Sequence, residues 1–206
     1  VPVEVFYPKK DTYIKKQPKL SIIIPTKDNI EILFNCLRSI TDKTKYSNYE
    51  IIVADTGSED KNMKQIEDFC KNNKKIKLVK FDYYNFAQIN NEVVYDHVSE
   101  DSELILFCNN DIELINDAIS RMVSTWIKNR KKVGTVGARL HFEDNTVQHG
   151  GMLLWLKKEW LSEQGLSRIE ITHYNLRQAY RHSCEGVAPV VGNTGAFLLV
   201  QKELFL

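Results

Sequence analysis

The chain has 206 residues, of which 43% are hydrophobic and 27% are charged, and its formal net charge is +1. These values fit one globular domain with a sizeable core and exclude a disordered or fibrous protein. A near-neutral charge gives no reason to expect a nucleic-acid partner, because phosphates usually require clustered Lys and Arg. Lysines do cluster at Lys74, Lys75 and Lys77, beside an expected helix end, where we expect them to be solvated.

The spacing of the cysteines indicates a cellular compartment, and the two ends of the chain indicate whether it is part of a longer protein. Cys36, Cys70, Cys108 and Cys184 lie far apart without a CxxC pair. This spacing argues against a zinc site or a disulfide framework and suits a reducing compartment, so we expect a cytoplasmic protein. Neither a membrane span nor a signal peptide is visible in the sequence. Because the first residue is Val and no helix stop signal precedes Leu206, we expect a piece of a longer protein.

The first part of the chain alternates short apolar runs with amphipathic segments. Residues 1–19 are polar and Lys-rich and form an expected N-terminal arm. Leu20–Ile24 is continuously apolar, as is typical of a buried parallel strand. A helix with apolar residues on one face follows over 30–40, and Asp28 or Asn29 is placed to cap it.

The same alternation continues to about residue 127. We expect further strands at Ile51–Ala54, Ile76–Phe81 and Leu104–Cys108, and helices at Met63–Cys70, Phe86–Val98 and Ala118–Ile127. The pattern predicts an α/β fold, with a Rossmann-like, mostly parallel sheet and helices on both faces. The first strand should lie beside Ile51–Ala54 and Leu104–Cys108, because all three are continuously apolar. After about residue 133 this alternation ends. Long irregular stretches then separate three strand-like runs, Val133–Leu140, Met152–Leu156 and Ala196–Val200.

Polar residues follow three of the expected strands. The groups are Pro25-Thr26-Lys27-Asp28, Asp55-Thr56-Gly57-Ser58 and Asn109-Asn110-Asp111. Ligands of open α/β sheets bind beyond the carboxyl ends of the strands, so we expect these groups to form one site.

Asp111 is the candidate metal ligand of this site. Mg²⁺ and Mn²⁺ take hard oxygen ligands and need only one or two protein carboxylates when phosphates complete the shell. The alternative is that Asn109-Asn110-Asp111 only makes a turn and caps the next helix. The first strand is followed by no glycine-rich turn, which weakens a dinucleotide-binding oxidoreductase and a P-loop enzyme or nucleotidyltransferase. A diphosphate bound here would therefore need a metal.

Six segments, in this order, resemble family 2 glycosyltransferases of the GT-A fold, especially bacterial surface-polysaccharide members. They are Leu20–Asp28, Glu50–Asp60, Tyr84–Asn91, Asn109–Asp111 in the place of the family's Asp-x-Asp motif, and the pair Val147–Gly151 and Gly192–Ala196. The resemblance covers residues 20–206. It departs from the family at Asn109, which replaces the first aspartate of the motif.

The resemblance implies a role for individual positions. A nucleotide-sugar site would be formed by Pro25, Thr26, Asp28, Asp55, Asn91, Asn109 and Asn110, with Asp55 bonded to the base or ribose. Asp111 would bind the Mn²⁺ or Mg²⁺ that bridges the diphosphate. Gly195 and Ala196 would lie near the acceptor, where the missing side chains leave room for a sugar. In the family, an acidic general base normally lies a few dozen residues after the strand that carries the Gly-Ala pair. We therefore expect the general base beyond Leu206.

The implied reaction moves a sugar from a UDP- or dTDP-linked donor to a glycan or lipid-linked acceptor, with inversion and a divalent metal. Residues 20–206 would then be a GT-A domain, truncated at its C-terminus. Its nucleotide-binding half would span about 20–115, and a more irregular acceptor-side half about 116–206. The alternative is a non-catalytic nucleotide-sugar or glycan-binding module of a larger polysaccharide-assembly protein.

Two features allow a functional and a structural interpretation. His149 precedes Gly150-Gly151 in a polar turn, where it could contact the donor phosphate or the acceptor, or be a hydrogen-bonded structural histidine. Trp155, Lys157, Lys158 and Trp160 could form a membrane-interface patch. Such a patch would suit peripheral association with the inner face of the membrane, whereas an ordinary strand edge with a charged turn is the alternative.

Overall fold

The computed structural model describes residues 17–158, 167–173, 176–178 and 186–206. These residues form two compact units. We call residues 17–136 with 195–206 the sheet unit, and the described part of 137–194 the hairpin unit. The arm expected over residues 1–19 lies mostly outside the described residues.

The sheet unit is built on a six-stranded sheet with the order β3-β2-β1-β4-β10-β5. Its strands are β1 (Lys19–Thr26), β2 (Tyr49–Asp55), β3 (Ile76–Lys80), β4 (Ser102–Cys108), β5 (Thr135–Gly137) and β10 (Phe197–Gln201). β1 pairs in parallel with both β2 and β4, while β10 runs antiparallel to β4. The prediction that the three most apolar strands are neighbours is therefore confirmed. Each is buried along nearly its whole length, as expected of strands covered on both faces.

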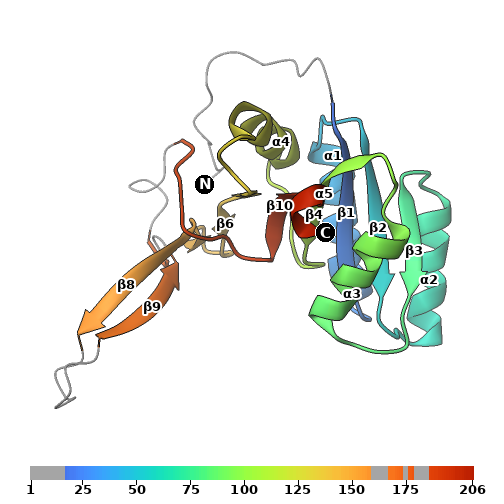
Figure 1. Cartoon of the computed structure of the whole chain (residues 1–206). Coiled ribbons are helices and arrows are strands. Elements are labelled where there is room, and N and C mark those ends of the chain that lie inside the picture. The colour runs from blue at the N-terminus through green and yellow to red at the C-terminus, as the bar shows by residue number, and fades with distance from the viewer. Residues whose placement is uncertain (1–16, 159–166, 174–175, 179–185) are drawn as a thin grey trace. The chain divides into compact units, whose positions relative to one another are not determined.

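Helices cover both faces of this sheet, as predicted (Figure 1). They are α1 (Ile30–Lys43), α2 (Asp60–Lys71), α3 (Phe86–Glu92), η1 (Val93–His97), α4 (Ala118–Asn129) and α5 (Lys202–Phe205). On one face, Ile23 and Ile52 pack in a core cluster with Ile89 of α3. On the other face, the Sγ atoms of Cys36 in α1 and Cys108 in β4 lie 4.0 Å apart.

Two of the expected elements differ in the structure. The segment expected as a helix over Phe86–Val98 is α-helical only to Glu92, and residues 93–97 form a π-helix. The N–H of Val98 reaches back to the carbonyl of Val93 at 3.0 Å, which widens the last turn. The expectation of one strand over Val133–Leu140 is wrong, because β5 joins the large sheet whereas Leu140 belongs to a separate two-stranded sheet.

The hairpin unit contains two short antiparallel pairs. β6 (Leu140–His141) pairs with β7 (Val147–His149), and β8 (Met152–Lys158) pairs with β9 (Ser167–His173). β8 contains the expected strand at Met152–Leu156, while β7 and β9 were not expected. Within the described parts of both units, no helix is long and apolar enough to cross a bilayer.

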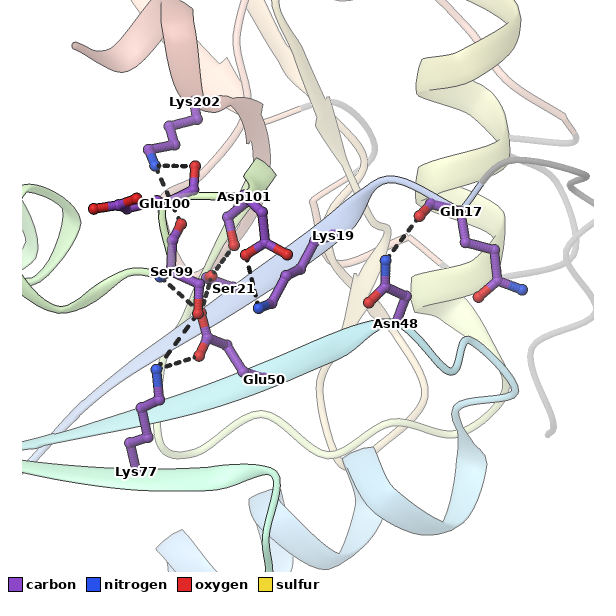
Figure 2. A network of polar contacts seen from close by, with 11 residues as sticks. Gln17, Lys19, Ser21, Asn48, Glu50, Lys77, Ser99, Glu100, Asp101 and Lys202 are labelled. Atoms are coloured by element: carbon purple, nitrogen blue, oxygen red, sulfur yellow. Dashed lines mark hydrogen bonds and ion pairs between the residues drawn. The ribbon is translucent and has the colours of Figure 1, made fainter.

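A network of polar contacts joins the strands at the amino-terminal end of the parallel sheet (Figure 2). Glu50 is buried at the start of β2. It accepts hydrogen bonds from Ser21 Oγ at 2.7 Å and from the N–H of Ser99 at 2.9 Å. Its other oxygen lies 2.6 Å from Nζ of Lys77. Lys77 is exposed, as expected for the lysine cluster, but it also neutralises a buried carboxylate, which the sequence did not indicate.

Candidate functional site

The three polar groups predicted from the sequence meet at the carboxyl end of the sheet. Pro25 and Thr26 end β1, Asp55 ends β2, and Asn109-Asn110-Asp111 follow β4. The chain moves outward from β1 to β2 and β3 on one side and continues with β4 on the other side. The carboxyl ends of β1 and β4 thus flank the point where the strand order reverses, which is where open α/β sheets bind ligands.

Thr26 connects all three loops. Its carbonyl oxygen accepts both the N–H and the hydroxyl of Thr56, at 2.9 and 3.0 Å. Its own hydroxyl accepts a hydrogen bond from Nδ2 of Asn110 at 3.1 Å. Thr26 and Thr56 are both buried, so these contacts are shielded from water. The loops are consequently held in place before any ligand arrives.

Asp28 bonds to the neighbouring loop and does not cap α1. Asn29 occupies the N-cap position of α1 with φ of 47° and makes no side-chain cap, so the predicted cap is wrong for both residues. The Asp28 carboxylate instead accepts the N–H of Glu59 at 3.0 Å and Nδ2 of Asn62 at 2.8 Å. The hydrogen bond from Asn62, followed by that from Glu59, holds the pKa of Asp28 below its usual range. The carboxylate is used to fasten the first loop to the start of α2.

Asp55 is fully buried, and its carboxylate accepts hydrogen bonds from the turn that follows it. One oxygen accepts the N–H groups of Gly57 and Ser58, at 3.0 and 2.9 Å, and the other accepts the Ser58 hydroxyl. Gly57 adopts φ of 93°, which lets the chain turn back around the carboxylate. Since a carboxylate oxygen has two acceptor positions, one position on Oδ2 remains for a ligand. Access to it requires a small movement of the turn.

Asp111 has the opposite surroundings. Its side chain is exposed, and within the described residues it accepts no hydrogen bond and forms no ion pair. Cys108, the last residue of β4, is buried, so the start of the loop is anchored while the Asp111 carboxylate is exposed. The described parts of the chain contain no cluster of three His, Cys, Asp or Glu side chains that could hold a metal alone. The donor set therefore fits a hard divalent cation only if a bound diphosphate supplies further oxygens.

The proposed acceptor residues Gly195 and Ala196 also reach this edge of the sheet. The carbonyl oxygen of Ala196 accepts the N–H of Asn109 at 2.9 Å. Gly195 is exposed, and a Cβ added to it would have no neighbour within 4 Å. The acceptor role of Gly195 and Ala196 stays a prediction.

The remaining candidates lie elsewhere. Asn91 is exposed on α3, whereas its neighbour Asn90 is buried. The Asn90 Nδ2 donates to the carbonyl of Phe86 at 2.7 Å, but its Oδ1 has no partner among the described residues. His149 belongs to the hairpin unit. The patch expected at Trp155–Trp160 involves side chains outside the described ones.

Sequence reasoning assigned no separate role to Ser58 and did not notice Asn62. Ser58 was visible as part of a polar turn, and its hydroxyl accepts the N–H of Asp28 at 2.6 Å while donating to Asp55. Asn62 lies on the first turn of α2, where nothing in the local sequence marks a partner 34 residues away. Only the packing of the two loops identifies it.

The chain is similar in sequence to proteins of one known family. Residues 21–183 match the family described as glycosyl transferase family 2. The chain is 30% identical over 191 residues to the uncharacterized protein y4gI of Sinorhizobium fredii, which covers 91% of this chain and 20% of y4gI. It is also 30% identical over 142 residues to the O-antigen biosynthesis protein RfbC of Myxococcus xanthus, covering 68% of this chain and 11% of RfbC. The chain thus spans about a fifth or less of these relatives.

Among solved structures, the fold is similar to that of the mannosyltransferase PcManGT from Pyrobaculum calidifontis, in complex with GDP-Man and Mn²⁺. The TM-score is 0.53 at 17% sequence identity, and the match covers 62% of this chain and 37% of PcManGT. At this identity the similarity concerns the fold. It agrees with the GT-A architecture that the sheet order and its carboxyl-end loops display.

Proposed function

Because the chain belongs to glycosyltransferase family 2, we propose that it takes part in moving a sugar from a nucleoside diphosphate to an acceptor hydroxyl. The donor is a UDP- or dTDP-linked sugar, and the acceptor is a glycan or a lipid-linked glycan. RfbC, a relative named for O-antigen biosynthesis, supports the glycan acceptor. The nucleotide-binding half is about 20–115, and the acceptor side lies within about 116–206.

The observation that carries this proposal is a contrast at the carboxyl end of the sheet. Hydrogen bonds fix the loops of the rim formed by Thr26, Thr56 and Asn110, whereas the carboxylate of Asp111 is exposed. Thr26, Thr56 and Asn110 are joined by hydrogen bonds, so the loops that would surround the nucleotide are organised in advance. Asp111 offers an exposed carboxylate that has no partner among the described residues. A site of this type binds an anionic diphosphate through a shared cation, because the protein supplies too few ligands by itself.

The chain's own residues would act on the donor in two places. Asp111 would hold the cation, Mn²⁺ or Mg²⁺, against the diphosphate. Asp55 would accept the N–H of the pyrimidine base at the remaining position of Oδ2. When bound, the cation supplies Lewis-acid stabilisation of the charge that develops on the leaving diphosphate. The GDP-Man and Mn²⁺ complex of PcManGT supports metal assistance in this fold.

The acceptor would approach from the side of Gly195 and Ala196. Ala196 is bonded to Asn109, so an acceptor beside Gly195 would lie near the loop that carries Asp111. Attack from the face opposite the leaving diphosphate inverts the anomeric carbon, and this stereochemistry is part of the proposal. A peripheral position at the cytoplasmic face of the membrane would suit a lipid-linked acceptor.

Calorimetry with UDP tests the proposal. We expect Mn²⁺ to strengthen UDP binding by about tenfold or more, equivalent to about 1.4 kcal/mol. Asp111→Ala should remove this gain while leaving metal-free binding within about twofold. Asp42→Ala is the matched control, because Asp42 is an exposed carboxylate near the far end of α1. Equal UDP affinity in Mn²⁺ and in EDTA would remove the metal from the proposed function.

A further inference from the structure

The segment that joins β3 to α3 carries two exposed aromatic side chains. Tyr84 is 69% exposed and Phe86 is 43% exposed. Within the described part of the sheet unit, Tyr95 is the one other aromatic residue that is exposed. We call residues 83–86 the aromatic turn. A single exposed ring is ordinary on a protein surface, whereas two rings within three residues offer a ligand a larger apolar surface.

The aromatic turn lies at the carboxyl edge of the sheet, on the side of Asp55 (Figure 1). β3 runs parallel to β2, and its last residue, Lys80, is paired with Asp55. The next residue, Phe81, donates its N–H to the carbonyl oxygen of Asp55 at 2.8 Å. Tyr84 follows Phe81 by three residues, so their Cα atoms lie at most about 11 Å apart. The two exposed rings therefore belong to the same edge as the loops that follow β1 and β2.

Packing and hydrogen bonds fix the aromatic turn against α3. The Tyr83 ring packs edge to face on Phe81, with centroids 5.7 Å apart and planes at 78°. Its hydroxyl donates to one oxygen of Glu92 at 2.6 Å, and the Gln88 side chain donates to the other at 2.8 Å. The Asn85 side chain accepts the N–H of Gln88 at 3.1 Å. The turn is consequently held in place before any ligand binds.

The backbone of Asn85 determines how the two exposed rings are placed relative to each other. Asn85 is extended, with φ of −148° and ψ of 108°. In an extended chain, the side chains before and after a residue leave on one side, and its own side chain leaves on the other. Because the Asn85 side chain turns toward α3, Tyr84 and Phe86 leave the chain on the side away from that contact.

We propose that Tyr84 and Phe86 form a stacking surface for the base of the nucleoside diphosphate. This inference rests on the proposed function, in which Asp55 accepts an N–H at the edge of the base. A contact at the edge leaves both faces of the base uncovered, and an aromatic ring covers a face. Stacking is tolerant of sequence because every base has a π face. Asp55 therefore selects the base, whereas the two rings add affinity for any base.

Calorimetry in Mn²⁺ tests the stacking surface. The double variant Tyr84→Ala/Phe86→Ala should weaken UDP binding by about tenfold or more, and GDP binding by a similar factor. The double variant Tyr84→Phe/Phe86→Tyr keeps both rings and should bind UDP within about twofold of the unaltered chain. Tyr95→Ala is the matched control, because Tyr95 is an exposed tyrosine four residues before Ser99, which contacts Glu50 at the opposite end of the sheet.

A ligand without a base separates stacking from damage to the site. Ribose 5-diphosphate with Mn²⁺ should bind the double alanine variant within about twofold of the unaltered chain, and Mn²⁺ should still strengthen UDP binding. Unchanged UDP affinity in that variant, or an equal loss for ribose 5-diphosphate, would overturn the stacking surface and leave the proposed function intact. Failure of UDP to bind the unaltered chain would overturn both.

Discussion

At the scale of single residues, Asp55 and Asp111 show how the same side chain serves different purposes at two strand ends. Asp55 is fully buried and accepts three hydrogen bonds from its own turn. Asp111 is exposed and accepts none within the described residues. Burial without partners would be costly for a carboxylate, so Asp55 requires the hydrogen bonds of its turn, whereas the exposed carboxylate of Asp111 requires none.

This difference predicts separable effects of substitution. Asp55→Ala should weaken UDP binding by about 1–3 kcal/mol and also lower the free energy of unfolding by about 1–3 kcal/mol, because its turn loses an acceptor. Asp111→Ala should change the free energy of unfolding by less than about 0.5 kcal/mol, as is usual for exposed sites. Urea unfolding combined with UDP calorimetry measures both quantities. A large loss of stability in Asp111→Ala would show that the carboxylate has a structural partner.

At the other end of the sheet, the charge of the buried Glu50 contributes to stability. Burial by itself raises the pKa of Glu50, but hydrogen bonds from Lys77, Ser99 and Ser21 outweigh it and hold the pKa at about 2. The folded pKa is lower than the unfolded value of 4.5, so the contribution is present above about pH 4.5 and is lost as the pH falls toward 2.

We expect Glu50→Gln to lower the free energy of unfolding at neutral pH by about 2–3 kcal/mol. The variant should also flatten the dependence of stability on pH between about 4.5 and 2. Urea unfolding at a series of pH values measures this, with Glu31→Gln on an exposed part of α1 as the control. An identical pH profile in Glu50→Gln and the unaltered chain would exclude Glu50 as the source.

At the scale of elements, the loops after β1 and β2 behave as one unit. The Ser58 hydroxyl accepts the N–H of Asp28 and donates to Asp55, while the Asp28 carboxylate reaches Asn62 at the start of α2. Asp28 and Asn29 both adopt positive φ, which is uncommon outside glycine and persists only where neighbouring contacts determine it. The contact between the two loops thus compensates for the unfavourable backbone of the first.

Ser58→Ala should therefore lower the free energy of unfolding by about 1–3 kcal/mol, because it leaves a donor and a carboxylate oxygen without their partner. The amide of Asp28 should exchange faster in the variant than in the unaltered chain. Thr41→Ala is the control, since Thr41 makes a similar hydroxyl contact, to the carbonyl of Arg38, at an exposed position. Unchanged exchange at Asp28 would mean that the loops are held by other contacts.

At the scale of the whole molecule, the rim formed by Thr26, Thr56 and Asn110 belongs to one compact unit, and the contact between His149 and His173 belongs to the other. The sheet unit also contains Gly195 and Ala196, because β10 returns to pair with β4 after the hairpin unit. The loops proposed for the donor and the residues proposed for the acceptor thus belong to the same unit. Ligand binding at the rim should stabilise the sheet unit by mass action.

We expect UDP and dTDP, each with Mn²⁺, to raise the melting temperature more than GDP with Mn²⁺ at equal concentration. At a hundredfold excess over the dissociation constant, stabilisation is about 2.7 kcal/mol. The preference follows from Asp55, which would accept the N–H of a pyrimidine base. Thermal unfolding followed by circular dichroism measures it. Equal stabilisation by GDP would remove the pyrimidine preference, and greater stabilisation by GDP would assign the site to a purine nucleotide. Either result would leave the metal-dependent part of the proposal standing.

The strands of the parallel sheet and the polar groups at their ends could be predicted from the sequence. Continuous apolar runs such as Leu104–Cys108 are local patterns, and the carboxyl ends of parallel strands must meet at one edge. The positions of Thr26, Asp55, Asn110 and Asp111 follow from these two facts. The family resemblance implied their functional roles, which the predictions above are designed to test.

Tertiary structure alone decided how the polar side chains are used. Asp28 lies beside the helix that it was expected to cap, yet its partners are 31 and 34 residues away. Lys77 lies in a basic cluster, yet it neutralises Glu50 on the next strand. His149 could be assigned to a ligand or to the structure until packing placed Nδ1 of His173, 24 residues away, at 2.7 Å from its own Nδ1. Apolar periodicity is encoded by neighbours in sequence, whereas a hydrogen bond depends on atoms within about 3 Å, which only packing brings together.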